Sequence, residues 1–189
     1  TEMIKSEIPN LIIVATSVQS TYKVLKIINK FKILTIIEKP IGCNFTESNK
    51  LKKLHNSNYF YIALNRRFYS NIQYAERNIH KDDKPVFINI TDQENNKILN
   101  KKKYPLKVRK NWMYANSIHL IDLINYFMRG EIKIIKLITK EKFLRSVYIE
   151  TNLGDKCIYT AIWNKPGPWN IQVSTNENYF NFKTWIFYC

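Results

Sequence analysis

Residues 11–40 read LIIVATSVQSTYKVLKIINKFKILTIIEKP, and they indicate the fold class more strongly than any other part of the chain. The apolar run over 11–15 is typical of a strand that is buried on both faces. Apolar residues at helical spacing follow it, and Ser17 or Ser20 can cap the start of this helix. A second apolar run covers 33–37, so this part of the chain predicts a strand, a helix and a strand.

The same alternation continues for one more round. A helix is predicted from about Thr46 to Leu54, and a strand over 59–64, which reads YFYIAL. Strands that alternate with helices through short joints are connected by right-handed crossovers and form a parallel sheet. The first third of the chain is therefore predicted to be α/β, the C-terminal half of a Rossmann-like parallel sheet.

The rest of the chain has a different pattern, in which strands dominate. A helix is expected over 72–78, a loop rich in lysine and asparagine over 93–110, and a second helix over 114–128 that ends before a glycine. Six strand-like runs are predicted, at 86–90, 133–139, 146–151, 157–163, 169–174 and 179–187. We therefore expect a first domain over 1–66, followed over 67–189 by an α+β domain with an open, mostly antiparallel sheet.

The composition fits a globular protein from a reducing compartment. The chain has 189 residues, 45% of them apolar and 14% aromatic, which argues against disorder. No apolar run approaches the roughly 20 residues of a membrane span, and the N-terminal residues do not resemble a secretory signal. Cys43, Cys157 and Cys189 are widely spaced and form no Cys-x-x-Cys pair. We therefore expect free thiols, no metal site and a cytoplasmic location.

The net charge of +15 raises the alternative of a nucleic-acid-binding protein. Lysine, isoleucine and asparagine are all abundant, however, in predicted surface and core positions alike, as in proteins encoded by AT-rich DNA. The densest basic run, over 101–110, lies in a predicted loop and has no alternating aromatic residues. Charge alone predicts only non-specific binding, so neither a nucleic-acid nor a membrane partner is predicted.

Polar residues follow each of the three predicted parallel strands. The strands end in Ala15-Thr16-Ser17, Glu38-Lys39-Pro40 and Asn65-Arg66-Arg67. One such end is weak evidence, because every strand must end and Lys-Pro is usually only a turn. In an open parallel sheet, however, ligands bind outside the carboxyl ends of the strands. Three consecutive polar ends therefore predict one binding crevice.

The predicted helix over 114–128 carries a fourth polar group. One side of it holds Asn116, His119, Asp122 and Tyr126, opposite an apolar face of Ile118, Ile121, Ile124 and Phe127. A lone helix histidine is usually a surface residue or a core residue with satisfied hydrogen bonds. This one lies between an amide and a carboxylate that can orient its ring. Spacing alone makes His119 a candidate and no more.

Taken in order, these motifs resemble the glucose–fructose oxidoreductase and inositol dehydrogenase family (Gfo/Idh/MocA). The matching elements are Val14-Ala15-Thr16, Glu38-Lys39-Pro40, Asn65-Arg66-Arg67-Phe68 and His119-Leu120-Ile121-Asp122, with similar spacing between them. The match covers about Ile8 to Phe127, and Glu-Lys-Pro after a buried strand is its most specific element. Members of the family oxidise or reduce sugars, nucleotide-linked sugars and polyols with NAD or NADP.

The resemblance implies a role for each matching residue. The cofactor would be bordered by Ala15, Thr16, Ser17, Glu38, Lys39 and Pro40, with Glu38 near the nicotinamide ribose. Lys39 would also be the catalytic lysine, and His119 the proton-transfer residue. The substrate would be contacted by Asn65, Arg66, Asn116 and Asp122. The first domain would then be a partial dinucleotide-binding domain, and the second would bind substrate and join a homo-oligomer through its sheet.

Hydride-transfer chemistry suits these residue types. When a carbinol carbon gives up hydride, a base must take the hydroxyl proton, and histidine titrates close to neutral pH. A free lysine has a pKa near ~10.4 and suits polarising the oxygen. The positive ring of an oxidised cofactor would lower that pKa by like-charge repulsion. How Lys39 and His119 divide the proton transfer therefore stays open.

Two features depart from the family. Ala115 stands where many members have an aspartate, four residues before His119, and Thr21 stands near the place of a further histidine. No Gly-x-Gly-x-x-Gly occurs, because the four glycines of the chain are far apart. We therefore expect a chain that is truncated at its N-terminus. The alternative is a non-catalytic descendant of the family that acts as a binding or assembly module.

Overall fold

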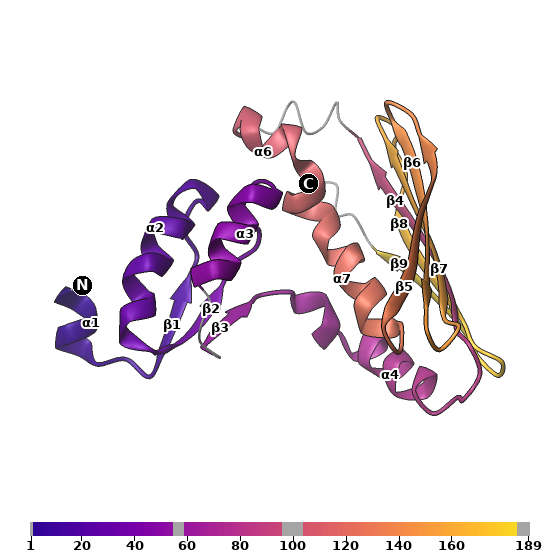
Figure 1. The fold of residues 1–189 in the computed structure, drawn as a ribbon, viewed down its shortest axis with the longest axis horizontal. Helices are drawn as coiled ribbons and strands as arrows, with labels where there is room; N and C mark the ends of the chain where they lie inside the picture. The colour runs from indigo at the N-terminus through magenta and orange to yellow at the C-terminus, as the bar shows by residue number, and fades with distance from the viewer. Residues whose placement is uncertain (1, 55–58, 96–103, 185–189) are drawn as a thin grey trace. The chain divides into compact units, whose positions relative to one another are not determined.

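The computed structural model describes residues 2–54, 59–95 and 104–184. By their contacts they divide into two compact parts, which we call unit 1 and unit 2 and which can be followed by colour in Figure 1. Unit 1 comprises residues 1–64 and 105–118, and unit 2 comprises residues 65–104 and 119–189. The functional domains predicted at 1–66 and 67–189 stay a prediction.

Unit 1 contains the parallel sheet that the sequence predicts. Its strands are β1 (Leu11–Val14), β2 (Leu34–Ile37) and β3 (Phe60–Ile62), in the order β1-β2-β3. The chain returns from β1 to β2 through helix α2 (Val18–Ile28) and the 3-10 turn η1 (Asn29–Phe31), and from β2 to β3 through helix α3 (Phe45–Leu54). The carboxyl ends of parallel strands point the same way, so those of β1 and β2 lie at one edge of this sheet.

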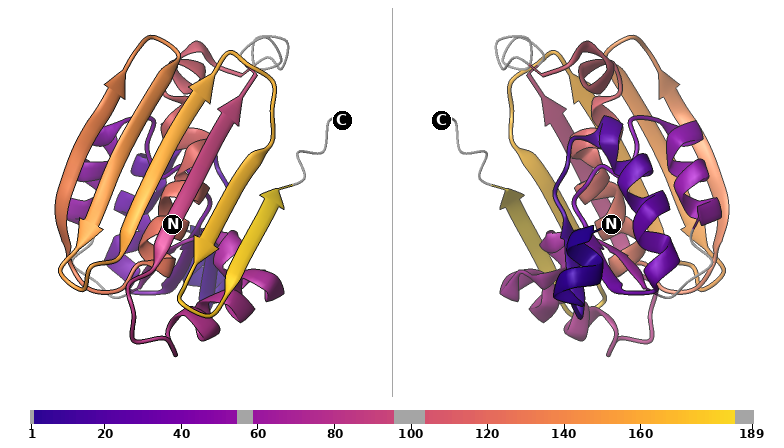
Figure 2. Two further views of the ribbon diagram at one scale, coloured as in Figure 1. Left: turned by 90° about the vertical axis from the view of Figure 1, so that its right-hand side faces the viewer. Right: turned by 90° about the vertical axis from the view of Figure 1, so that its left-hand side faces the viewer.

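Only one face of this sheet is covered by the described residues of unit 1. Helices α2 and α3 lie on the same side (Figure 2). Their core residues, with those of the strands and of helix α1 (Glu2–Glu7), are Ile4, Val14, Leu25, Ile28, Ile37, Leu51 and Phe60. On the opposite face Leu11 is 43% exposed and Ile13 is 69% exposed. The prediction that residues 11–15 are buried on both faces is therefore wrong. Two right-handed crossovers that advance in one direction place both helices on one side of the sheet.

Unit 2 is built on a six-stranded sheet. Its strands are β4 (Phe87–Glu94), β5 (Ile132–Lys140), β6 (Leu144–Thr151), β7 (Lys156–Trp163), β8 (Trp169–Ser174) and β9 (Tyr179–Thr184). They lie in the order β5-β6-β7-β4-β8-β9, and every neighbouring pair is antiparallel except β4 and β7. The predicted open, mostly antiparallel sheet is confirmed.

One face of the six-stranded sheet carries the core of unit 2. Helix α4 (Ser70–Ile79), which follows the 3-10 turn η2 (Asn65–Phe68), packs on this face with helix α7 (Ile118–Phe127). The side chains of β4 alternate between buried and more exposed positions, as expected for a strand with one covered face. The fully buried side chains of this cluster include Ile79, Ile88, Leu120, Phe127 and Ile171.

The structure departs most from the predicted elements at three places. Strand β4 continues to Glu94, and helix α6 (Leu106–Lys110) forms inside the predicted loop, of which residues 96–103 lie outside the described residues. The predicted helix over 114–128 begins as a π-helical turn, η3 (Met113–Ser117), before α7. One π-helical turn barely alters the spacing of apolar residues, so the pattern does not reveal it. The end of the last predicted strand, 185–187, also lies outside the described residues.

None of the helices that the structure describes is both long and apolar enough to cross a membrane.

Candidate active site

Two of the predicted cofactor-binding segments leave the same edge of the unit 1 sheet. The Glu38 backbone N–H donates to the Val14 carbonyl at 2.9 Å, which extends the pairing of β1 and β2 beyond their last residues. Residues 15–17 and 38–40 therefore start side by side. All of 15–17 and Glu38 are exposed, so their polar atoms can meet a ligand at this edge.

Ser17 stands at the N-cap of α2, as predicted, but its hydroxyl makes no capping bond to the described backbone. Its Oγ instead lies 3.1 Å from the Ser20 Oγ. The Ser17 carbonyl accepts a hydrogen bond from the Thr21 hydroxyl at 3.2 Å. Thr21 is buried, so the residue that stands near a family histidine has a structural role in fixing the start of α2.

Lys39 is held by the backbone of another segment of unit 1. Its ammonium Nζ donates to the Ala115 carbonyl in η3 at 2.9 Å, and its backbone N–H donates to Glu38 Oε2 at 3.0 Å. The side chain is half-buried, and the Lys39–Pro40 peptide bond is cis. The structure thus places this lysine at the carboxyl edge of the sheet with its charged end in a fixed direction.

The other predicted site residues belong to unit 2, except Asn116, which is half-buried in η3 of unit 1. The third predicted polar end follows β3, whose pairing with β2 extends by one residue because the Ala63 N–H donates to the Ile37 carbonyl. Asn65 and Arg66 follow in η2, where Asn65 is exposed and Arg66 half-buried.

His119 and Asp122, on the predicted polar side of α7, are buried. His119 is 6% exposed and Asp122 is 7% exposed, whereas Ile118 and Ile121 of the predicted apolar face are half-buried. Spacing predicts one buried stripe for a surface helix, but α7 is enclosed on nearly all sides, with only Asn125 exposed. This burial excludes the interpretation of His119 as an ordinary surface histidine.

Asp122 is paired with Arg67, which lies 55 positions earlier in the chain. Arg67 Nε donates to Asp122 Oδ2 at 2.6 Å, and Arg67 Nη2 donates to Oδ1, which makes the pair bidentate. The bond to Asp122 raises the pKa of the Arg67 guanidinium. The same guanidinium lies 5.4 Å from the centre of the Tyr126 ring. Asp122 therefore ties η2 to α7, and a role in substrate binding stays a prediction.

A second polar cluster in unit 2 was missed by the sequence analysis. Asp92 is fully buried and Glu94 is 8% exposed, both on the helix-facing side of β4, and the Tyr159 hydroxyl donates to Asp92. The Arg66 guanidinium lies 4.3 Å from the centre of the Trp169 ring. Burial lowers the pKa of Arg66, while the charges of nearby Tyr69, Glu94 and Asp92 oppose that shift. The predicted strand ended at Ile90, whereas β4 continues to Glu94. The alternation of β4, extended over these residues, assigns Asp92 and Glu94 to the buried face.

Two buried nitrogens beside this cluster have no hydrogen-bond partner in the part of the chain that the structure describes. They are Arg66 Nη1 and Trp163 Nε1, and both are donors. A buried donor without a partner costs stability, of order 1–3 kcal/mol. A ligand that carries hydroxyl or carbonyl oxygens would satisfy such donors.

A third cluster, in unit 1, is structural. The Lys107 ammonium of α6 pairs with the Glu47 carboxylate of α3, and the Cys43 N–H donates to Glu47 Oε2 at 2.8 Å. The bond from Lys107 lowers the pKa of Glu47. Burial raises the pKa of the Cys43 thiol, and burial raises that of Cys157 to about 12. Neither thiol is therefore ionised at neutral pH, as a nucleophile would have to be.

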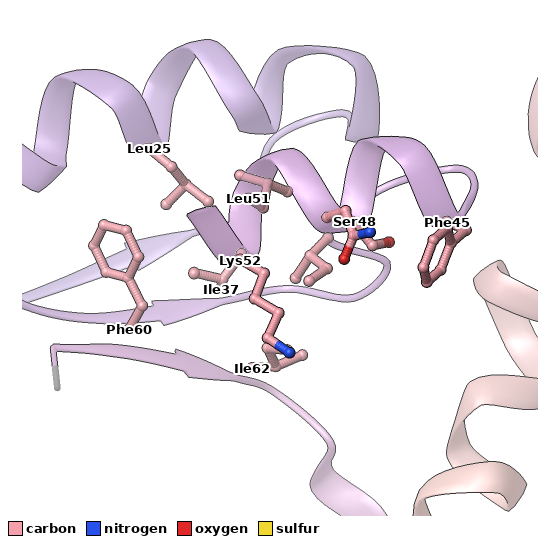
Figure 3. A pocket seen from close by; sticks show the side chains of 10 residues that line it. Leu25, Ile37, Phe45, Ser48, Leu51, Lys52, Phe60 and Ile62 are labelled. Carbon is pink, nitrogen blue, oxygen red and sulfur yellow. The ribbon is translucent and has the colours of Figure 1, made fainter. Parts of the chain in front are cut away.

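Unit 1 also holds an apolar pocket of about 650 Å³ on the helix-covered face of its sheet (Figure 3). Leu25, Leu51, Ile37, Phe60 and Ile62 line it, and the polar side chains are those of Ser48, Asn49 and Lys52. No residue of 15–17 or 38–40 contributes to its lining. The pocket is therefore separate from the predicted cofactor edge.

No protein-family model matches the sequence, and the comparison with curated proteins gives no match. Solved structures are similar in fold. An oxidoreductase from Thermotoga maritima has a TM-score of 0.75 at 18% identity, with 97% of this chain and 61% of that one covered. The WlbA dehydrogenase from Bordetella pertussis, in complex with NADH and UDP-GlcNAcA, has a TM-score of 0.74 at 9% identity, with 97% and 58% covered. The Thermus thermophilus WlbA dehydrogenase, in complex with NAD and UDP-GlcNAcA, has a TM-score of 0.68 at 14% identity, with 93% and 61% covered.

These structures are Gfo/Idh/MocA-type oxidoreductases, so the fold that the sequence motifs implied is confirmed. The chain spans about six-tenths of the length of these structures. Identities this low establish the common fold and leave the activity to be tested.

Proposed function

We propose that the protein to which this chain belongs transfers a hydride between NAD or NADP and a hydroxyl or carbonyl group of a sugar, nucleotide-linked sugar or polyol. The main support is that residues 15–17 and 38–40 leave adjacent parallel strands at one carboxyl edge, with the Lys39 ammonium anchored there. Open α/β sheets bind ligands at this edge. Structures of similar fold were determined with NAD or NADH, which supports the same cofactor here.

The residues at this edge suit the nicotinamide half of a dinucleotide. Ala15, Thr16 and Ser17 are small and exposed, and the exposed Glu38 carboxylate can accept hydrogen bonds from ribose hydroxyls. The pyrophosphate half has no matching glycine-rich turn in this sequence. We therefore expect the 189-residue chain alone to bind either cofactor weakly, with a dissociation constant above about 1 μM.

Lys39 and His119 are proposed to act on the reacting oxygen. When bound, the nicotinamide supplies the hydride acceptor or donor. The Lys39 ammonium would donate to the substrate oxygen, where a fixed cation is worth most as negative charge develops. His119 is buried, and a neutral imidazole there can take the hydroxyl proton. Either residue can hold that proton, so their shares are a matter for experiment.

The substrate is proposed to contact Asn65, Asn116 and the polar cluster of unit 2. Asp92, Glu94 and Arg66 combine acceptors and donors with the apolar ring of Trp169, a set that suits a hydroxyl-rich ring. Asp122, already bound to Arg67, would orient η2 beside the substrate. Among the similar structures, those with UDP-GlcNAcA support a sugar substrate without selecting one.

A non-catalytic binding or assembly module is the second candidate. Ala115 in place of a carboxylate favours it, as do exposed apolar side chains on both sheets. Leu11 and Ile13 are exposed on β1, and Ile135, Leu137 and Ile138 on β5. A homo-oligomer through the unit 2 sheet would cover the β5 residues. The free, buried Cys43 and Cys157 support a cytoplasmic setting for either candidate.

Hydride transfer in the full-length protein tests the proposal. Absorbance of NADH or NADPH would be followed with a panel of polyols, sugars and UDP-sugars. We expect turnover with at least one of them, and a roughly 100-fold or greater loss of kcat in Lys39→Met, because positioned acid–base groups contribute that much. Lys52→Met, which removes a lysine from the separate pocket, should leave kcat within twofold.

Two results would refute this function. One is the absence of turnover with every substrate despite measurable cofactor binding. The other is a Lys39→Met variant whose kcat matches that of Lys52→Met.

A further inference from the structure

A backbone carbonyl in unit 1 holds the charged end of Lys39. The ammonium lies 2.9 Å from the Ala115 oxygen, and the two residues are 76 positions apart in the chain. Both belong to the same compact unit. The bond joins the carboxyl edge of the parallel sheet to η3, so it fixes the direction of one side chain that the proposed reaction needs.

The acceptor lies in an unusual piece of backbone. Residues 113–117 form a π-helical turn between α6 and α7. In an α-helix each carbonyl points at the N–H four residues on, and a π-helical turn changes that register. Ala115 and Ser117 are buried on this turn, beside the buried Trp112. Its backbone is therefore enclosed by packing, and π-helical turns of this kind are frequent at functional sites.

The alternative is that the bond from Lys39 to Ala115 only holds the segment 105–118 against the rest of unit 1. Another contact already connects these parts, because Lys107 of α6 is paired with Glu47 of α3. That pair is formed by two charged side chains near the surface, which is the usual form of a tie between elements. The Lys39 bond differs, since it leads from a half-buried ammonium to a neutral carbonyl.

We propose that the Ala115 carbonyl is the positioning group for Lys39 and that η3 presents it. This inference rests on the proposed function, in which Lys39 acts on the substrate oxygen. A neutral acceptor directs the ammonium and favours its charged form less than a carboxylate would. An ammonium carries three N–H groups, so a bond to Ala115 is compatible with donation to a substrate.

The bond can be observed directly by NMR in the chain itself, without cofactor or substrate. With ¹⁵N-labelled lysine and alanine labelled with ¹³C at the carbonyl, the Lys39 ammonium should exchange slowly with water, unlike exposed lysines such as Lys133. It should also show a scalar coupling through the hydrogen bond to one alanine carbonyl. In Ala115→Gly the carbonyl remains but loses its label, so the ammonium signal should stay and the coupling should vanish. Lys39→Met should remove the ammonium signal and so assign it.

Absence of the coupling in a folded chain would overturn the inference. So would a coupling that survives Ala115→Gly, which would identify a different alanine as the acceptor. Because the unmodified chain already gives a decisive result, a variant that fails to fold leaves the test intact.

The positioning role has its own readout in the full-length protein. In Ala115→Asp the new carboxylate should favour the charged lysine, so the alkaline limb of the pH profile of kcat should move upward by about one unit. An unchanged profile in a folded variant would show that η3 does not present position 115 to the Lys39 ammonium, and it would overturn that part of the proposal. Absence of any turnover would count against the proposed function only, since the NMR coupling does not depend on it.

Discussion

Asp155 shows at the level of one residue what the sequence could and could not predict. The turn Asn152-Leu153-Gly154-Asp155 is evident from its residue types, and the structure has it between β6 and β7. The aspartate is fully buried and accepts hydrogen bonds from the backbone N–H groups of Val86 and Arg129 and from the Arg129 side chain. Those partners lie 26 and 69 positions away, so local pattern gave no sign of them.

Removing this charge should destabilise unit 2 strongly. Asp155→Asn leaves the Arg129 guanidinium, whose side chain is only 12% exposed, without the carboxylate that pairs with it. Breaking a buried pair costs roughly 3–5 kcal/mol. Asp83→Asn is the matched control, because Asp83 is 84% exposed in a surface pair with Lys84, and it should change stability by less than about 0.5 kcal/mol. Urea unfolding followed by circular dichroism measures both, and equal midpoints for the two variants would contradict the assignment.

Urea unfolding of the unmodified chain and of Asp155→Asn at several pH values tests the acid dependence of stability. Burial by itself raises the pKa of Asp155, but the bonds from Arg129 and from the Val86 and Arg129 N–H groups outweigh it, and the net pKa is lowered. A lowered folded-state pKa gives stability that is complete above the unfolded value of ~3.9 and is lost as pH falls through the folded value. Below about pH 4 the unmodified chain should therefore lose stability more steeply than Asp155→Asn.

Among the candidate site residues, chain order and residue type were enough to single out Lys39 and the polar ends of β1 and β2, and the structure places those ends side by side. The partners of these residues were not predictable. The Ala115 carbonyl is a backbone atom, and the ion pair of Arg67 with Asp122 links positions 55 apart. Asp92 was missed because β4 was ended at Ile90, where polar residues begin.

At the level of secondary structure, β1 shows the limit of reading an apolar run. Alternation of strands and helices correctly gave a parallel sheet, yet the run over 11–14 does not show which faces are covered. Which face of β1 is covered depends on the side of the sheet on which α2 and α3 pack, and both pack on the side of Val14. The π-helical turn η3 is a second such limit, because the helical period of apolar residues hardly changes across it.

Adjacent positions on β1 test the one-sided burial. Val14→Lys puts an ammonium into the core of unit 1, where Val14 is 4% exposed, and should cost several kcal/mol or prevent folding of the unit. Ile13→Lys changes the next residue, 69% exposed, and should cost less than about 1 kcal/mol. Circular dichroism and urea unfolding of the two variants compare them directly. Similar large losses in both would show that the second face of β1 is covered as well.

At the level of the whole molecule, the two units are joined by three chain crossings, near residues 64, 104 and 118. Sequence pattern divided the chain once, near residue 66, because a change from alternating helices and strands to successive strands is visible there. It could not assign the segment 105–118 to unit 1. That assignment depends on contacts such as Lys107 with Glu47 and Lys39 with Ala115.

The proposed reaction requires the two units to act together, since Lys39 belongs to unit 1 and His119 to unit 2. If both residues serve one proton transfer, removing either should lower kcat by roughly 10²–10⁴-fold. Removing both should then lower kcat little more than the worse single change, because the effects of groups that act as a unit are not additive.

The experiment compares kcat of the full-length protein with that of Lys39→Met, His119→Asn and the double variant. His80→Asn serves as the control, since His80 follows the last residue of α4 and is 43% exposed. Additive losses would mean that the two residues act in separate steps. A His119→Asn variant with unchanged kcat would mean that this buried histidine serves only the packing of α7.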